Sequence, residues 1–338
     1  MTYNPKISIV MPNYNGIKYL EKAINGFLNQ DYENKELILV DGKSTDDSHN
    51  IIEKYCNSND FIKWVKEEDK NVSDAFNIGL KYVKGEIVGF MSTDSIYYTN
   101  DIFKAISFNY SKFGFDAIYF DAYSHFVNER SIVLRSCNYS FDRDTFFKIG
   151  CFLPFENILF KKEVFETQKL DPQFNMSSDI DFYYRILGNK ILALYINKVS
   201  TINIYDGKNL SVVNASRQQK EWRRVDIKYL FEKLEEKDFE LNELILTGGY
   251  PITKSFIKDS ETWILKILDA NRQKNYFSEQ VIIDRYLPVW RNLIIAGQKL
   301  GLGTYYTVAK SPLYRHLNLT TAQRAKLWIS CLIGPIRG

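Results

Sequence analysis

The first ninety residues alternate short apolar runs with segments of helical periodicity, and this alternation constrains the fold more than any other feature. Four runs have the composition of buried strands: Lys6–Met11, Glu36–Val40, Phe61–Lys66 and Glu86–Met91. Three amphipathic segments lie between them: Ile17–Asn29, the stretch from Asp46 or Asp47 to about Cys56, and Asp74–Val83. Strands that alternate with helices predict βαβ units and a mostly parallel sheet, so we expect an α/β fold.

Polar residues follow three of these strands. Pro12–Gly16 forms a turn after the first strand, Asp41 begins a polar stretch after the second, and Ser92–Ser95 follows the fourth. Right-handed crossovers place the carboxyl ends of parallel strands on one edge, where open α/β sheets bind ligands. An Asp at this edge can hold a divalent cation, which in turn can hold a diphosphate.

Structural interpretations of the same residues remain open. Asp94 and Ser95 can cap the turn or helix that follows them. Asp41 can accept backbone N–H groups from its own turn, Gly42–Ser44, or can bind a base or a ribose. The chain lacks GxGxxG after the first strand and lacks GxxxxGK[ST] throughout. A diphosphate held without a Gly-rich loop needs a metal or basic side chains, and Asp94 is the best metal candidate.

The pattern changes after Asn100. Asp116–Asp121 and Ile132–Arg135 are predicted to pair as a hairpin, and Lys161–Gln168 is predicted to be a short helix. Ser177 or Ser178 can cap a further apolar helix that has Asp179 in its first turn. One hypothesis makes Asp179 a general base; the alternative is that Asp179 and Asp181 only complement the helix dipole.

The chain from Ala215 onward is charged and helical in pattern, with helices predicted at Arg217–Lys237, Ser255–Ala270 and Glu279–Gln298. Its tail, Tyr305–Gly338, combines aromatic and basic residues and has no acidic residue. Such a tail is typical of a segment bound to an anionic membrane, or of a packed helix with a solvated basic face. A dimerisation element, an acceptor platform and a membrane dock all remain open for this region.

Charge and cysteine usage exclude several classes. The net charge of +3 and the pI near 8.4 are too weakly basic to indicate a nucleic-acid partner. The four cysteines form no CxxC pair and no zinc-ligand spacing, which is typical of a reducing compartment. With no visible signal peptide and no apolar run of transmembrane length, we expect a cytoplasmic protein, either free or peripheral on the inner face of the membrane.

Several segments, in this order, resemble the family-2 (GT-A fold) glycosyltransferases of bacterial colanic-acid, O-antigen and capsule biosynthesis. They are ISIVMPNYNG, FLNQDYENKELILVDGKSTDDS, EEDKNVSDAFNIGLKYVKGE, FMSTDS and LPFENILFKKEVFE…FNMSSDIDFYYRIL. The resemblance covers roughly residues 6–195. It implies a GT-A domain over 1–212, with a nucleotide-binding half (1–100) and an acceptor-side half (101–212). A helical region would follow over 213–338.

The resemblance also implies a reaction: inverting transfer from a nucleotide-diphospho-sugar, with UDP-sugars expected first, to a hydroxyl of a saccharide or a lipid-linked saccharide. It assigns the general base to Asp179 and a Mg²⁺ or Mn²⁺ ligand to Asp94. It assigns donor binding to Pro12, Asn13, Tyr14, Asn15, Asp41, Lys43, Ser44, Asp74, Thr93 and Asp94. Relatives usually carry acids at the positions of Ser92 and often Ser95, so this chain departs from the pattern there.

Two other functions are consistent with such a fold. A nucleotidyltransferase that makes a nucleotide-sugar usually has a basic, Gly-rich loop after the first strand, whereas here the first basic residue is Lys18. A catalytically silent nucleotide-sugar-binding module is favoured only by the reduced number of acids around Asp94.

Overall fold

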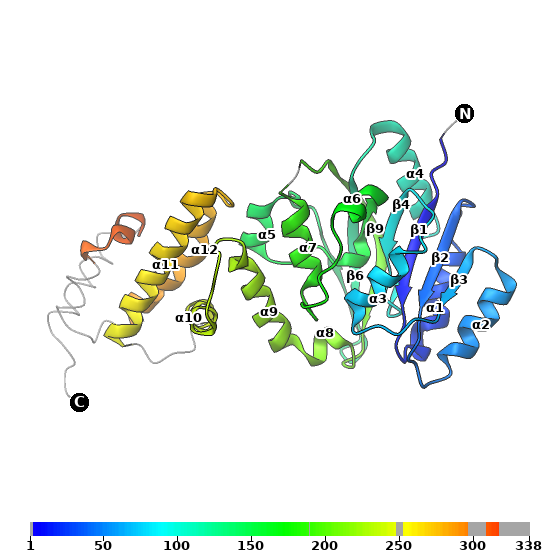
Figure 1. Cartoon of the computed structure of the whole chain (residues 1–338), viewed down its shortest axis with the longest axis horizontal. Helices are drawn as coiled ribbons and strands as arrows, with labels where there is room; N and C mark the ends of the chain where they lie inside the picture. The colour runs from blue at the N-terminus through cyan, green and yellow to red at the C-terminus, as the bar shows by residue number, and fades with distance from the viewer. Residues whose placement is uncertain (1–2, 189, 248–252, 297–308, 318–338) are drawn as a thin grey trace. The chain divides into compact units, whose positions relative to one another are not determined.

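The computed structural model describes residues 3–188, 190–247, 253–296 and 309–317 (Figure 1). The chain divides into two compact units. The first comprises residues 1–142 and 151–221, and the second comprises 143–150 and 222–338. The division into domains at 1–212 and 213–338 stays a prediction. Most of the tail Tyr305–Gly338, with Cys331, lies outside the described residues, as do Gly297 and Gln298 at the end of the last predicted helix.

The first unit begins with the predicted parallel strands. Strands β1 (Ile7–Pro12), β2 (Lys35–Val40), β3 (Ile62–Val65) and β4 (Ile87–Phe90) lie in the order β3-β2-β1-β4, all parallel. Helices α1 (Ile17–Leu28), α2 (Ser48–Ser58) and α3 (Val72–Leu80) connect them. Helix α3 begins two residues before the predicted Asp74 because the Asn71 side chain accepts the Asp74 N–H and caps it. The predicted βαβ arrangement is confirmed.

The rest of the sheet contains both antiparallel and parallel strand pairs, and only part of it was predicted. Strand β8 (Ile158–Lys161) pairs antiparallel with β4 and with β6 (Ala117–Phe126). Beyond β6 lie β9 (Ala193–Tyr205), parallel to it, and then β5 (Ser95–Tyr97), while β7 (Ser131–Arg135) forms the predicted hairpin with β6. Strands β5, β8 and β9 were missed. The helix predicted from Lys161 is wrong at its start, because Lys161 ends β8 and α6 spans Lys162–Thr167.

Helices cover both faces of the sheet (Figure 1). On one face, alternate β1 residues join Phe27 of α1 and Phe103 of α4 (Ile102–Phe113) in the main core. On the other face, α3 packs so closely that a Cβ on Gly79 would lie 2.4 Å from Val10. An aromatic cluster on this second side joins α3, α6, α7 (Ser178–Ile186) and the short helix η1 (Phe155–Asn157): Phe76, Phe90, Phe155, Phe165 and Phe182.

The second unit is helical. Its elements are α5 (Arg143–Ile149), the end of α9 (Ala215–Lys228), α10 (Glu236–Thr247), α11 (Lys254–Lys274), α12 (Glu279–Ala296) and η3 (Pro312–His316). The single helix predicted over Arg217–Lys237 is wrong: it ends at Lys228, and the Asp238 carboxylate accepts the Glu235 N–H where α10 begins. Within the described ranges, no helix is both long enough and apolar enough to cross a bilayer.

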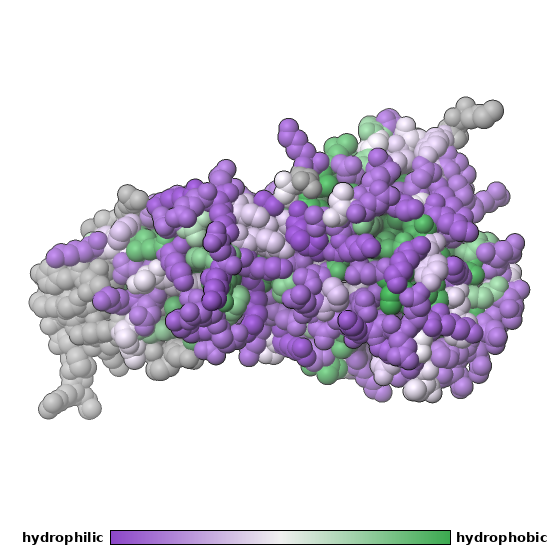
Figure 2. All heavy atoms as spheres, viewed as in Figure 1, coloured by the Kyte–Doolittle hydropathy of each residue, from purple (hydrophilic) through white to green (hydrophobic). Residues whose placement is uncertain are grey.

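Both units follow the ordinary distribution of side chains. The central strands β1, β2 and β4 of the first unit and the packed sides of α11 and α12 are buried, with Trp263, Tyr286 and Trp290 among the residues that water does not reach. Figure 2 shows hydrophilic side chains over most of the visible face where residues are described, with apolar side chains in smaller patches. A short helix, α8 (Leu210–Val213), ends the loop after β9 in the first unit.

Candidate active site

Asp41 lies at the end of β2, fully buried beneath the turn that follows β1. Its carboxylate accepts hydrogen bonds from the Asn13 amide and from the backbone N–H groups of Lys43 (3.2 Å) and Ser44 (3.0 Å). The His49 ring lies 3.1 Å from the same carboxylate. These contacts are those expected when a carboxylate organises its own turn, which is one of the two interpretations of Asp41 made from the sequence.

The turns after β1 and β2 are joined through Asn13, Asn15 and Ser44. The Asn13 amide donates to Ser44 Oγ (3.1 Å), and Ser44 Oγ also accepts the Asn15 N–H (2.8 Å). Asn15, at a positive φ of 51°, accepts the Thr45 N–H through its side chain (2.8 Å). Pro12 ends β1, and the Tyr14 ring stands exposed. The result is one shared loop platform with an aromatic side chain free above it.

The platform is tightly packed. A Cβ on Gly16 would lie 2.3 Å from Asn13 Oδ1 and 2.7 Å from Thr93 Oγ1, so only glycine fits. Asn13 Oδ1 is buried and has no hydrogen-bond partner within the described part of the chain. An unpaired buried acceptor is costly. Its position between Gly16 and Thr93 marks where a donor group of a ligand could be received.

Lys43 and Asp74 lie near the loop after β3. Lys43 Nζ is 3.8 Å from an Asp69 carboxylate oxygen, and Asp74 Oδ2 accepts the Lys70 N–H (3.0 Å). Asp74 sits in the first turn of α3, and its neighbour Ser73 shares a 2.5 Å hydrogen bond with Ser178 at the start of α7. The first turns of α3 and α7, which carry Asp74 and Asp179, therefore lie side by side.

Asp94 follows β4 and is held on both carboxylate oxygens. Ser92 Oγ donates to one (2.6 Å), and the Asn209 amide donates to the other (2.5 Å). Ser92 Oγ is also 2.9 Å from the buried Ser95 Oγ. Ser92 and Ser95 thus form a hydroxyl pair that orients the Asp94 carboxylate.

Asp179 lies half-buried in the first turn of α7, as predicted from the sequence. Burial raises the pKa of its carboxyl to about 6, although the Ile180 N–H, at 2.9 Å, works in the opposite direction. Cys151 Sγ is 3.9 Å from Asp179 Oδ2. A carboxylate with a pKa near 6 is mostly ionised at neutral pH and is more basic than a free Asp, as a general base requires.

Two charged residues near Asp179 were not singled out from the sequence. Arg135 at the end of β7 donates to the carbonyls of Cys151 (2.6 Å) and Phe152 (3.2 Å), and its charge lowers the pKa of Asp179. Burial, with the charge of Asp94, raises the pKa of Glu156 to about 7. The signal for Glu156 was a lone acid inside the apolar run LPFENILF.

The carboxyl ends of the strands thus bring most of the predicted residues to one edge. Asn13, Asn15, Asp41, Lys43 and Ser44 share the loop platform, and Thr93 contacts it through Gly16. Asp74 and Asp179 meet through α3 and α7. Such an edge can hold a nucleotide with its diphosphate directed toward Asp94, and a hydroxyl that loses its proton toward Asp179.

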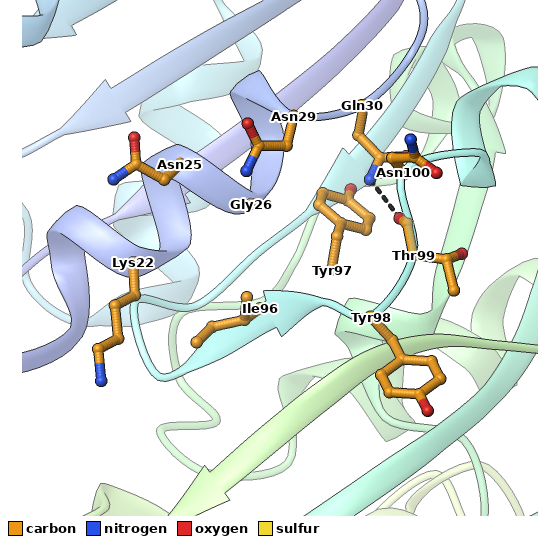
Figure 3. A pocket seen from close by; sticks show the side chains of 10 residues that line it. All are labelled: Lys22, Asn25, Gly26, Asn29, Gln30, Ile96, Tyr97, Tyr98, Thr99 and Asn100. Atoms are coloured by element: carbon orange, nitrogen blue, oxygen red, sulfur yellow. Dashed lines mark hydrogen bonds between the residues drawn. The ribbon is translucent and has the colours of Figure 1, made fainter.

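A separate groove of about 470 Å³ lies between α1 and β5 (Figure 3). Its lining includes Asn25, Asn29, Asn100 and the exposed Tyr98. Gln30 closes one end by donating to the Thr99 carbonyl (2.6 Å). None of the predicted site residues lines this groove, so it is not the predicted donor site.

Comparison with known proteins shows which family and which solved structures this chain resembles. Residues 8–168 match the family described as Glycosyl transferase family 2. The chain is 30% identical over 198 residues to an uncharacterized glycosyltransferase of Rickettsia typhi, covering 55% of this chain and 60% of the relative. It is 36% identical over 97 residues to glycosyltransferase GlyG of Streptococcus pneumoniae, covering 28% of this chain and 32% of the relative. The chain thus matches 60% or less of the length of these relatives.

Among solved structures, residues 1–349 of S. aureus TarS resemble the chain with a TM-score of 0.57 and 15% identity, over 85% of this chain and 90% of that one. The same protein in complex with UDP-GlcNAc gives a TM-score of 0.56. At this identity the likeness shows the fold. Residues 8–168 thus resemble a glycosyltransferase family 2 domain, and the fold is GT-A, followed by a helical C-terminal region.

Proposed function

We propose that the protein is an inverting glycosyltransferase that uses a nucleotide-diphospho-sugar, with UDP-sugars as the first candidates. The carrying observation is that α3 and α7 meet through Ser73 and Ser178, which sets the donor-side loops and Asp179 at one edge. UDP is chosen because S. aureus TarS was solved with UDP and with UDP-GlcNAc. The acceptor is proposed to be a hydroxyl of a saccharide or lipid-linked saccharide of the bacterial surface.

The reaction requires one proton acceptor and one stabilised leaving group. Asp179 takes the proton from the acceptor hydroxyl as that oxygen bonds to the anomeric carbon. The bond from this carbon to the diphosphate oxygen breaks, and the nucleoside diphosphate leaves with the electron pair. Because attack and departure occur on opposite faces, the sugar configuration inverts. Asp179 receives this proton most effectively where its carboxyl is ionised, above its pKa of about 6.

Some of the donor-side residues are proposed to hold the loops in place, and others to contact the nucleotide. Asp41 is buried and satisfied within the protein, so we assign it to holding the loop of Lys43 and Ser44 in place. The exposed Tyr14 ring is suited to stack on a base. Asn13, Asn15, Asp74 and Thr93 complete the proposed edge.

A divalent cation fits this edge only if the substrate supplies some of its ligands. Among the described residues, no three His, Cys, Asp or Glu side chains lie close enough together to hold a metal. Asp94 would hold Mg²⁺ or Mn²⁺ with one carboxylate, and diphosphate oxygens and water would complete the shell. When bound, the cation would neutralise the charge that develops on the leaving diphosphate.

Calorimetric titration with UDP, with and without Mn²⁺, tests the donor site. We expect Mn²⁺ to strengthen UDP binding to the wild type, and Asp94→Ala to remove that gain. Asp60→Ala is the matched control, because Asp60 is an exposed carboxylate before β3, at the opposite ends of the parallel strands. Binding that ignores Mn²⁺ would remove Asp94 from the metal role while leaving the transferase proposal intact.

Asp179→Asn separates catalysis from binding. We expect turnover to fall by about 10²–10⁴-fold, the usual contribution of a general base, with UDP affinity nearly unchanged. A large loss of UDP affinity in this variant would contradict the assignment of Asp179 as base. If the wild type binds neither UDP nor GDP, CMP or dTDP, the catalytically silent module becomes the better description.

A further inference from the structure

Glu156 is the half-buried member of a short, rigid element. It lies in η1, between Phe155 and Asn157, which are both buried. Phe155 packs edge-on against Phe76 at 5.5 Å. The Asn157 amide donates to Ser200 Oγ (2.7 Å) and Thr201 Oγ1 (2.8 Å). Its neighbours therefore fix the backbone of Glu156, and its own side chain is left partly open.

The fold directs this side chain to the reacting centre. Strand β8 pairs antiparallel with β4, with Leu159 opposite Gly89, so the residues just before β8 come close to those that follow β4. The Ser92 hydroxyl interacts with the Glu156 carboxyl. The negative charges of Asp94 and Asp179 also raise the pKa of this carboxyl. Glu156 thus lies near both Asp94, the acid on the leaving-group side, and Asp179, the proposed base.

The charges around Glu156 define what can bind there. Among the described residues, no Lys, Arg or His forms an ion pair with Glu156. Three neighbouring carboxyls repel a phosphate, so the diphosphate cannot lie against Glu156 unaided. No cluster of three metal-binding side chains exists in the described ranges. A neutral group rich in O–H donors is the ligand that suits this position, because carboxylate oxygens are strong acceptors.

We propose that Glu156 accepts a hydrogen bond from a hydroxyl of the transferred sugar and positions that sugar between the diphosphate and Asp179. This inference rests on the proposed glycosyltransferase function. It makes Glu156 a residue that selects the donor sugar, whereas the loops after β1 and β2 select the nucleotide. Ser92 has a short side chain and leaves room beside Asp94 for this carboxyl, which comes from η1 just before β8.

The experiment compares UDP with UDP-sugars by calorimetry, because UDP lacks the group that Glu156 is proposed to hold. The probes are UDP, UDP-Glc, UDP-Gal, UDP-GlcNAc and UDP-GalNAc. They are titrated into the wild type, Glu156→Gln and the control Glu163→Gln, which makes the same change at an exposed position of α6. The titrations are made at about pH 8.5, above the pKa of about 7 of Glu156, so that its carboxyl is ionised. We expect Glu156→Gln to weaken the preferred UDP-sugar by about tenfold and to leave UDP within about twofold, since a charged hydrogen bond becomes a neutral one.

Other outcomes are distinct. An equal loss for UDP and the UDP-sugar would overturn the proposal, because Glu156 would then act on the nucleotide or on a cation. Unchanged affinity for both would overturn it as well, while leaving the proposed function standing. A wild type that binds none of the probes would overturn the proposed UDP-sugar donors, and this inference with them. If Glu156→Gln does not fold, Glu156→Asp, which keeps the charge but shortens the side chain, is judged by the same two affinities.

Discussion

Asp179 provides a test in which stability and catalysis move in opposite directions. The folded protein raises the pKa of this carboxyl from 3.8 to about 6. In the unfolded chain the proton leaves near the ordinary value, so between these two pH values folding favours the protonated form. Above pH 6 the folded state carries an ionised group in surroundings that prefer the neutral one. Replacing Asp179 with Asn should therefore stabilise the first unit at neutral pH.

The magnitude follows from the pKa. Each pKa unit corresponds to about 1.4 kcal/mol, which gives roughly 3 kcal/mol for the full difference. Asp179 is only half-buried, and solvent screening reduces the figure to about 2 kcal/mol. For a unit of this size, that free energy corresponds to an increase of about 4–8 °C in the unfolding midpoint.

Thermal unfolding from about pH 3 to about pH 8, a range that spans both pKa values, is the assay. The quantity compared is the difference between the unfolding midpoint of Asp179→Asn and that of the wild type. We expect this difference to be small at the acid end, to grow through about pH 6 and to be constant above about pH 7. Asp60→Asn, an exposed carboxylate, should show no such rise. A difference that does not depend on pH, or a variant that becomes less stable than the wild type as pH rises, would refute the reasoning.

Three further perturbations test the site and the second unit. Because Asp179 must be ionised, kcat/KM measured across pH should fall below about pH 6, and a rate that stays level down to about pH 5 would contradict its role. Gly16→Ala drives a Cβ into the Asn13 side chain, so titration calorimetry should show UDP affinity reduced by more than about tenfold and thermal unfolding should show a cost of about 1–3 kcal/mol. Arg285→Met removes the 2.5 Å ion pair of the buried Asp226 and should destabilise the second unit by about 1–5 kcal/mol in urea unfolding; a change below about 1 kcal/mol would show that the pair does not stabilise this unit.

The parallel half of the sheet could be predicted because each strand is a short apolar run bounded by turn residues. The antiparallel half could not. Strand β8 has four residues and passes directly into α6 at Lys162, with no turn residue between them to mark the change. Strand β9 is long but mostly half-buried, so it shows no clear alternation of apolar and polar residues. Both strands form because they pair with segments that are distant in the chain, and a local sequence pattern does not show such pairings.

The candidate site divides in the same way. Asp41, Asp94 and the Pro12–Gly16 turn could be predicted to converge, because parallel strands fix where their ends lie. The contact of Asn209 with Asp94 joins residues far apart in the chain, and no spacing rule predicts it. Glu156 depends on the antiparallel register of β8, which was itself missed. The residues that follow the parallel strands could therefore be predicted from the sequence, and the contacts that the antiparallel half brings to them could not.

The mixed topology itself has a functional consequence. A purely parallel sheet would gather the nucleotide-binding loops at one edge but would bring no chain from the opposite direction. Strand β8 runs antiparallel to β4, so its first residues arrive at the edge where β4 ends, beside Ser92. The Ser73–Ser178 hydrogen bond brings the start of α7 to the same place. If Glu156 holds the sugar and Asp179 the acceptor proton, both depend on elements outside the βαβ half, and exchanging that second half between relatives should change sugar and acceptor preference while nucleotide preference stays.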